Sequence, residues 1–193
     1  MEFCLLGPLL VRADGAIVRV PPGNQRTLLA ALLLSAGRAV PLSEIAEILW
    51  GPAPPPSARV SVQNYVMRLR HGMGEVGRER IVTQPRGYLI RAAASELDAS
   101  RFEVLLAAAQ AAARDGSWDQ AAMDARGALE LWRGEPLADV DSELLAQREV
   151  PRLAELRLQA LEVRIDADLH LGRRAEVITE LRELARTHPQ GAQ

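Results

Sequence analysis

Short apolar runs separated by turn residues open the chain. Gly7-Pro8 and Ala13-Asp14-Gly15 punctuate this region, and Pro21-Pro22-Gly23 closes it. Apolar runs of a few residues between Gly and Pro are typical of strands. We therefore expect a small antiparallel sheet of two or three strands, formed from Met1–Leu6, Leu9–Val11 and Ile17–Val20.

The pattern then changes to helical spacing. A first helix is predicted from an N-cap at Asn24 to about Ser35, ended by Ala36-Gly37. A second begins at Ser43 and closes at Trp50-Gly51. Four prolines make the next segment a stiff, non-helical loop because they fix φ and remove donors. That loop consists of Gly51, Pro52, Ala53, Pro54, Pro55 and Pro56.

A third helix, Ser57–Gly72, is predicted with Ser57 as its cap and Gly72 and Gly74 at its end. Its apolar positions step by four, three and four residues, so they form one face: Val62, Val66, Leu69 and Met73. A hairpin of Ile81–Gln84 and Tyr88–Arg91 follows across Pro85-Arg86-Gly87. Strands, three helices and a hairpin in this order predict a winged helix-turn-helix.

The remainder is helical in pattern. Ser95–Ser100 is expected to be a polar linker in which Asp98 caps a helix. The predicted helices are Arg101–Arg114, Trp118–Trp132, Ser142–Leu171 with Pro151 as a kink or new first turn, and Arg173–Thr187. Gly turns before Ala-containing helices indicate a tetratricopeptide-like array. The fold class is thus mainly α with small β: residues 1–93 form the winged helix and residues 94–193 an all-α domain.

Charge divides the chain in the same way. The net charge is −2, yet residues 1–91 hold 11 Arg and 6 acids, whereas residues 92–193 hold 12 Arg and 19 acids. All basic residues are Arg; none is Lys. Residues 59–91 carry seven Arg against Glu75 and Glu79. A local basic patch is typical of a nucleic-acid binder.

The third predicted helix has the side chains that DNA recognition needs. No acid occurs from Ser57 to Gly74. Arg matches guanine O6 and N7, while Asn and Gln match adenine N6 and N7. A basic solvated helix without a ligand would normally mix Glu with its Arg to form ion pairs. The expected DNA-contacting residues are Arg59, Ser61, Gln63, Asn64, Tyr65, Arg68, Arg70 and, on the wing, Arg86.

Other functional classes find little support. The three His are scattered, and no metal-ligand spacing, P-loop, Rossmann or nucleophile-elbow pattern occurs, so we expect no enzyme, cofactor or metal site. The single Cys4 excludes an internal disulfide. No signal peptide or apolar run of about 18 residues is present, which predicts a cytoplasmic protein. Trp118 and Trp132 lie in the acidic half, where core packing is the simpler interpretation.

Taken together, these segments resemble the Streptomyces antibiotic regulatory proteins, the SARP family. The family pairs an OmpR-type winged helix with a bacterial transcriptional activation domain of tetratricopeptide-like helices. The resemblance covers residues 1–187. It rests on Leu5–Leu9, Arg26–Leu34, Leu49–Gly51, Val62–Arg70, Pro85–Leu89, Leu97–Phe102, Ala128–Gly134 and Pro136–Val140.

The resemblance implies an activator, of antibiotic biosynthesis genes, that binds promoter direct repeats and contacts RNA polymerase and its sigma factor. A homodimer on DNA is a separate expectation. It implies that the loop Gly51–Pro56 contacts polymerase. It also implies that Arg68 and Arg70 contact the major groove and the DNA backbone, and that Arg86 reaches the minor groove.

Two departures from the family leave questions open. His71-Gly72-Met73-Gly74 replaces a more basic ending, so the third helix is expected to fray early. The family's activation domain usually continues with further helices, so this chain is either shortened or naturally short. An alternative function also stays open: an adaptor whose tetratricopeptide-like half and winged helix both bind protein.

Overall fold

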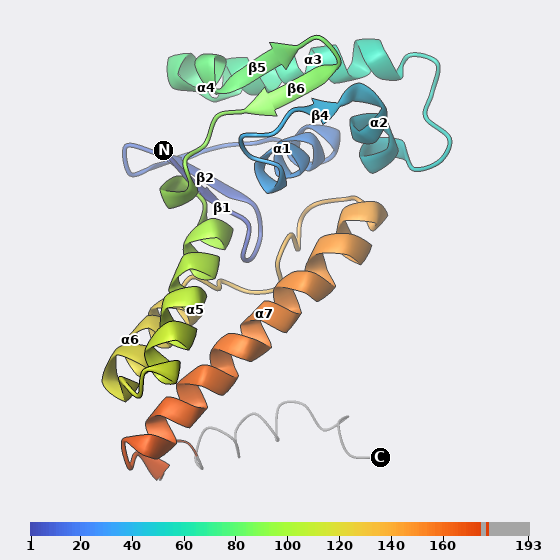
Figure 1. The fold of residues 1–193 in the computed structure, drawn as a ribbon. Helices are drawn as coiled ribbons and strands as arrows, with labels where there is room; N and C mark the ends of the chain where they lie inside the picture. Colours follow the sequence, from blue (N-terminus) through green and yellow to red (C-terminus); the bar gives the residue numbers. More distant parts are fainter. Residues whose placement is uncertain (175–176, 178–193) are drawn as a thin grey trace. The chain divides into compact units, whose positions relative to one another are not determined.

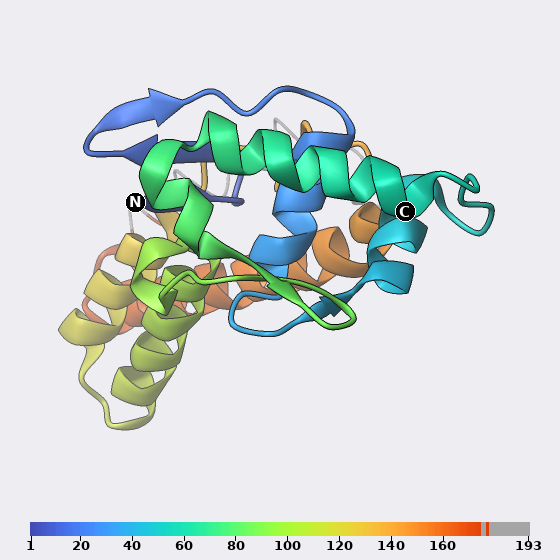
Figure 2. The same ribbon diagram turned by 90° about the horizontal axis from the view of Figure 1, so that it is seen from above.

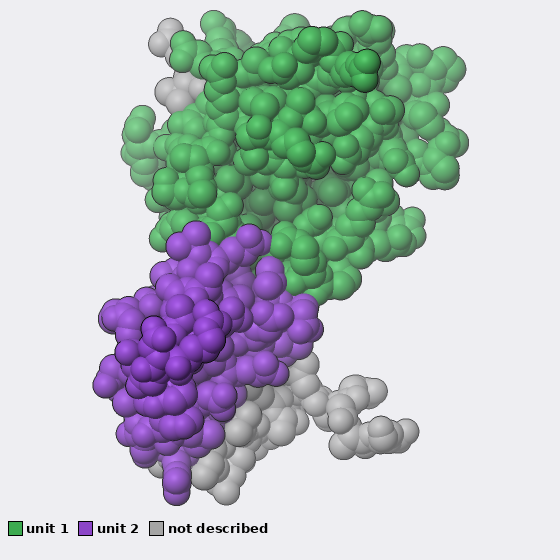
Figure 3. Space-filling view, in the orientation of Figure 1, with its two compact units in different colours: residues 1–101, 131–154 green, residues 102–130, 155–193 purple. Residues whose placement is uncertain are grey.

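The structure is a computed structural model that describes residues 1–174 and 177, without the side chains of residues 75 and 76. The chain divides into two compact units, coloured in Figure 3. Unit 1 consists of Met1–Arg101 and Leu131–Ala154, and unit 2 of Phe102–Glu130 and Glu155–Gln193. These units do not follow the predicted division after residue 93, because Leu131–Ala154 packs with the winged helix. The prediction that residues 1–93 and 94–193 are separate domains stays a prediction.

A three-stranded antiparallel sheet begins unit 1, as the apolar runs predicted. Its strands are β1 (Glu2–Cys4), β2 (Leu10–Ala13) and β3 (Ala16–Val18), in that order across the sheet. The β2–β3 turn places Asp14 and Gly15 at positive φ. Phe3 and Val11 face each other across the sheet and are both buried in the core.

Three helices follow: α1 (Asn24–Leu34), α2 (Leu42–Trp50) and α3 (Ala58–Gly72), shown in Figure 1. The prediction of Asn24 as an N-cap is wrong. Gly23 holds that position, and the Asn24 amide instead donates to the Tyr65 hydroxyl at 3.1 Å. Ser57 does occupy the N-cap of α3, but its side chain makes no capping hydrogen bond.

The predicted hairpin is present as β5 (Ile81–Gln84) and β6 (Gly87–Ile90). Two elements were not predicted: a short strand β4 (Val40–Pro41), which pairs with β6, and a short helix α4 (Gly74–Arg80). Gly87 is required by the pairing, since a Cβ there would lie 1.9 Å from the Val40 carbonyl oxygen. The wing is therefore held by its own hairpin and by the segment between α1 and α2.

One apolar core joins these elements. The face of α3 predicted to be buried is confirmed, with Val62 fully buried and Val66, Leu69 and Met73 at most 5% exposed. These side chains pack in one cluster with Leu28, Leu29 and Leu32 of α1, Ile45 of α2 and Ile81 and Ile90 of the wing.

Residues from the second half of the sequence complete that core. Leu137 and Leu145 belong to the same cluster. The Arg133 amide donates to the Leu6 carbonyl at 2.7 Å, and the Leu137 amide donates to the Leu5 carbonyl at 3.1 Å. Arg26 of α1 pairs with Asp139. We call residues 131–142 the strap, because they run along the winged helix before α7 (Glu143–His170) begins.

The prediction of a polar linker over Ser95–Ser100 is wrong. This segment forms a 3₁₀ turn, η1 (Ala94–Glu96), and then begins α5 (Asp98–Arg114) with a buried carboxylate. Asp98 accepts the backbone amides of Leu5 at 2.7 Å and Leu6 at 3.0 Å, besides that of Ala99. Burial raises the pKa of Asp98, against the lowering effect of these hydrogen bonds and of Arg133, 3.7 Å away. Asp98 thus fixes η1 and the start of α5 to the segment directly after β1.

Glu96 makes unit 1 sensitive to acid. Two hydrogen bonds from Arg80, of 2.7 and 2.8 Å, lower the pKa of Glu96 from 4.5 to about 2. The unfolded chain therefore binds this proton first, and the stabilisation by Glu96 is lost as the pH falls from about 4.5 towards 2. We expect urea unfolding to show a smaller acid-induced loss of stability in Glu96→Gln than in the parent. Equal losses in both proteins would contradict this.

Unit 2 is helical. It contains most of α5, α6 (Trp118–Leu129) and the second part of α7. Ala121, Ala122 and Ala167 form one buried apolar cluster in this unit, against which Trp118 packs. The helix predicted to end at Trp132 ends at Leu129. Pro151 lies inside the continuous helix α7 and begins no new helix. Gly172 ends the helical run at positive φ, and most of the predicted helix Arg173–Thr187 lies outside the described residues.

Candidate nucleic-acid interface

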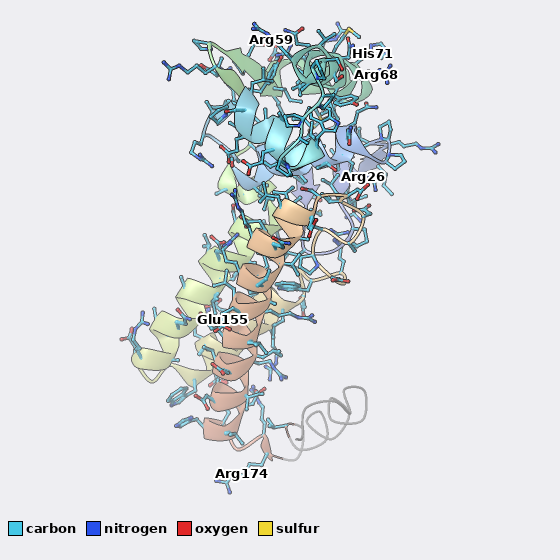
Figure 4. The ribbon with its side chains drawn as sticks, turned by 90° about the vertical axis from the view of Figure 1, so that its right-hand side faces the viewer. Arg26, Arg59, Arg68, His71, Glu155 and Arg174 are labelled. Atoms are coloured by element: carbon cyan, nitrogen blue, oxygen red, sulfur yellow. The ribbon has the colours of Figure 1, made fainter. Side chains whose placement is uncertain are left out.

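The side of α3 that faces away from the core is open. In the view from above in Figure 2, α3 is seen along its length and no other segment crosses in front of it. Arg59, Arg68 and His71, labelled in Figure 4, lie along it at the top of that view. Because the helix has 3.6 residues per turn, burying Val62, Val66, Leu69 and Met73 turns the opposite ridge to solvent.

The structure separates the predicted DNA-contacting residues into two groups. The exposed ones are Arg59, Gln63, Asn64, Arg68 and Arg86, and the half-buried ones are Ser61, Tyr65 and Arg70. The first group is therefore the more accessible to a ligand. The contacts of each residue with DNA stay a prediction.

Tyr65 belongs to the packing between helices. Its hydroxyl accepts the Asn24 amide, and its ring centroid lies 6.4 Å from that of Trp50. The Tyr65 hydroxyl still has its proton to donate to a DNA phosphate, as predicted. The contacts with Asn24 and Trp50 would already hold the side chain in place for that contact.

Arg70 is held by the wing. Its guanidinium donates to the Ile81 carbonyl through Nε at 3.0 Å and through one terminal nitrogen at 2.6 Å, and that nitrogen also donates to the Thr83 hydroxyl at 3.0 Å. Arg70 therefore connects the end of α3 to β5. Sequence reasoning missed this role, because the period of a helix shows a residue's face but not its neighbour.

A hollow of about 300 Å³ lies between part of α3 and the wing. Arg59 and Gln63 line it from the helix, and Arg86 lines it from the hairpin tip, together with Thr83, Gln84 and Tyr88. Cations on both walls of a groove attract a phosphate backbone. The structure thus brings Arg59 and Arg86, far apart in sequence, to one basic groove.

The difference between Arg68 and Arg70 gives a prediction. Arg68→Ala should cost about 1–3 kcal/mol in DNA binding and relax preference at one base position if Arg68 contacts guanine, while thermal stability stays unchanged.

Arg70→Ala should in addition lower the free energy of unfolding by about 1.5–3 kcal/mol, because it removes charged hydrogen bonds to the wing. Urea melts and titrations against a base-substituted operator series measure both. A stable Arg70→Ala, or a uniform loss over all sequences for Arg68→Ala, would contradict these roles.

The loop between α2 and α3 is non-helical, as its prolines predicted, and most of it is exposed. Its first residues, Gly51 and Pro52, line a hollow of about 560 Å³ whose other wall includes Asp141 and Glu143. The loop is therefore accessible in unit 1. Its contact with polymerase stays a prediction.

The described residues contain no group of three or more potential metal ligands. None of the helices within this part of the chain is long and apolar enough to cross a membrane.

Known proteins share both halves of this architecture. A family model described as "Transcriptional regulatory protein, C terminal" matches residues 21–90, and one described as "Bacterial transcriptional activator domain" matches residues 97–191. Regulatory protein DnrI of Streptomyces peucetius is 34% identical over 197 residues, which cover 98% of this chain and 72% of that protein. Regulatory protein AfsR of Streptomyces coelicolor is 40% identical over 190 residues, but the match covers 19% of its length.

A solved structure shares this fold. Mycobacterium tuberculosis EmbR, in complex with a low affinity phosphopeptide, matches with a TM-score of 0.91 and 32% identity. The match covers 98% of this chain and 51% of EmbR, so the chain spans about half of that relative.

A winged helix with an open, acid-free third helix, followed by an activator domain of helices, defines a transcriptional regulator. The chain belongs to the family of Streptomyces antibiotic regulatory proteins. The predicted family and fold class are thereby confirmed. The relatives are named as regulatory proteins, and neither family model describes an enzyme.

Proposed function

We propose that this protein is a sequence-specific activator that binds direct repeats in promoters of antibiotic biosynthesis genes, in the cytoplasm, and recruits RNA polymerase. The observation that carries the proposal is the solvent-facing side of α3, which has no acid from Ser57 to Gly74 and exposes Arg59, Gln63, Asn64 and Arg68. Arg forks and side-chain amides recognise base edges, and acids would repel phosphates. Membership of the family supports the kind of target gene.

The proposed polymerase contact involves the loop Gly51–Pro56. Its support is the family resemblance, the exposure of the loop and its stiffness. A stiff loop loses little conformational entropy when a partner binds it. RNA polymerase and its sigma factor are the proposed partners, and a homodimer on DNA is the proposed assembly.

The salt dependence of DNA binding tests the proposal. With about 4–6 phosphate contacts per protomer, the logarithm of the association constant should fall against log salt with a slope of about −0.9 per contact. The measurement is fluorescence anisotropy with promoter DNA at several salt concentrations. Arg59→Ala and Arg86→Ala should each make the slope about one unit shallower. The exposed Arg114 of α5 supplies a control, because Arg114→Ala should leave the slope unchanged.

The opposite result identifies the alternative. A flat salt response, or no binding to promoter DNA at low salt, would overturn the DNA proposal and leave a protein-binding adaptor. Footprinting tests the assembly: two protected direct repeats about 10–11 base pairs apart support head-to-tail protomers on DNA.

A further inference from the structure

The outermost ridge of α3 is partly apolar. Val60 and Met67 are 58% and 60% exposed, although both side chains are large and hydrophobic. They share this ridge with Asn64 and His71, at spacings of four, three and four residues. This ridge lies opposite the buried one, which has the same spacing, so it is the part of α3 farthest from the core.

Folding does not account for these two side chains. A single exposed hydrophobic residue is ordinary. Here two of them lie two turns apart on one line of the proposed DNA-binding helix. Polar side chains flank that line: Arg59 and Gln63 on the side of the wing, and Arg68 on the other.

The major groove of DNA has one prominent apolar feature, the 5-methyl group of thymine. An exposed valine or methionine on a helix in that groove has no better complement there. Met67 also lines a hollow of about 360 Å³ together with Arg70, His71 and Arg78. An apolar side chain among cations suits a base methyl group beside phosphates.

We infer that Val60 and Met67 recognise the methyl groups of two thymines, with Asn64 between them placed for an adenine edge. The inference rests on the proposed function and deepens it by naming the bases that the centre of α3 contacts. Seven residues of helix span about 10.5 Å, close to three base-pair steps of about 3.4 Å. The two thymines are therefore about three base pairs apart, and the operator half-site is rich in A·T pairs at its centre.

Replacing thymine by deoxyuridine tests the inference, because it removes only the methyl group. The preferred site is first selected from a randomised double-stranded DNA pool with the complete chain. Each thymine is then replaced in turn, and affinity is measured by anisotropy. We expect about a fourfold loss at two positions about three base pairs apart, the change that corresponds to one buried methyl group.

The variants assign each position. Val60→Ala should abolish the sensitivity at one thymine and Met67→Ala at the other, with melting temperatures unchanged because both side chains are exposed. Ile17→Ala removes a hydrophobic residue that is even more exposed, 69% on β3, and should leave both sensitivities intact.

The outcomes separate the inference from the proposed function. Tight, salt-dependent binding to a selected site in which every deoxyuridine is tolerated would overturn the inference and leave the DNA-binding proposal standing. Unchanged sensitivities in Val60→Ala and Met67→Ala would do the same. A pool that yields no enriched sequence, with no binding at low salt, would overturn both.

Discussion

Truncating Leu69 to alanine is expected to lower the free energy of unfolding by about 2–5 kcal/mol, the usual cost of a buried leucine truncation. Leu69 is 2% exposed and packs in the cluster that joins α3 to α1, α2 and the wing. The cavity would lie under the proposed DNA-binding surface, so binding should weaken together with stability. Urea denaturation followed by circular dichroism measures the change.

Met67 is a matched control two residues away. Its side chain is exposed, so Met67→Ala should change the free energy of unfolding by no more than about 0.5 kcal/mol. If Leu69→Ala kept the parent's stability and lost only DNA binding, the assignment of faces on α3 would be wrong.

The second large effect is expected at Asp98. Asp98→Ala should cost about 3–5 kcal/mol, because it leaves the buried amides of Leu5 and Leu6 without their acceptor and Arg133 without its nearby carboxylate. The loss should appear in the same urea experiment.

Asp115, exposed in the turn after α5, supplies the control. Asp115→Ala should be nearly neutral, since it removes no buried acceptor. An Asp98→Ala protein as stable as the parent would show that the junction between β1 and α5 contributes little to unit 1.

The local spacing of apolar residues was enough to predict the elements that bury one regular face. The spacing of Val62, Val66, Leu69 and Met73 predicted the core side of α3, and the short runs on either side of Pro85-Arg86-Gly87 predicted the wing. These signals work because one neighbour, the core, decides every position in the element. The glycines predicted helix ends correctly, because Gly37 and Gly172 adopt the positive φ that a helix end needs.

Long-range contacts were beyond the pattern. Asp98 was taken for a cap in a linker, yet two of its acceptor contacts reach residues more than 90 positions away. Most of the strap was predicted only as the segment between the helices Trp118–Trp132 and Ser142–Leu171, because hydrogen bonds between irregular segments leave no period in the sequence. β4 is two residues long, too short to give a strand pattern.

The candidate site shows the same division. Sequence composition predicted the acid-free surface, and the structure exposes five of the eight residues proposed from it. The composition could not show that Arg70 would form hydrogen bonds with the wing, because those bonds depend on where β5 lies. The ridge of Val60 and Met67 did leave a signal, since both positions lie opposite the predicted core face.

The strap has a consequence for how this protein is made. Unit 1 consists of two stretches of sequence, and the second ends at residue 154. A ribosome adds about 5–20 residues per second, so roughly 3–10 seconds pass between the synthesis of residue 101 and that of residue 154. During this interval the winged helix lacks Leu137, Leu145 and the Asp139 partner of Arg26. The proposed DNA-binding surface therefore reaches its final stability only after the whole of α6 has been translated.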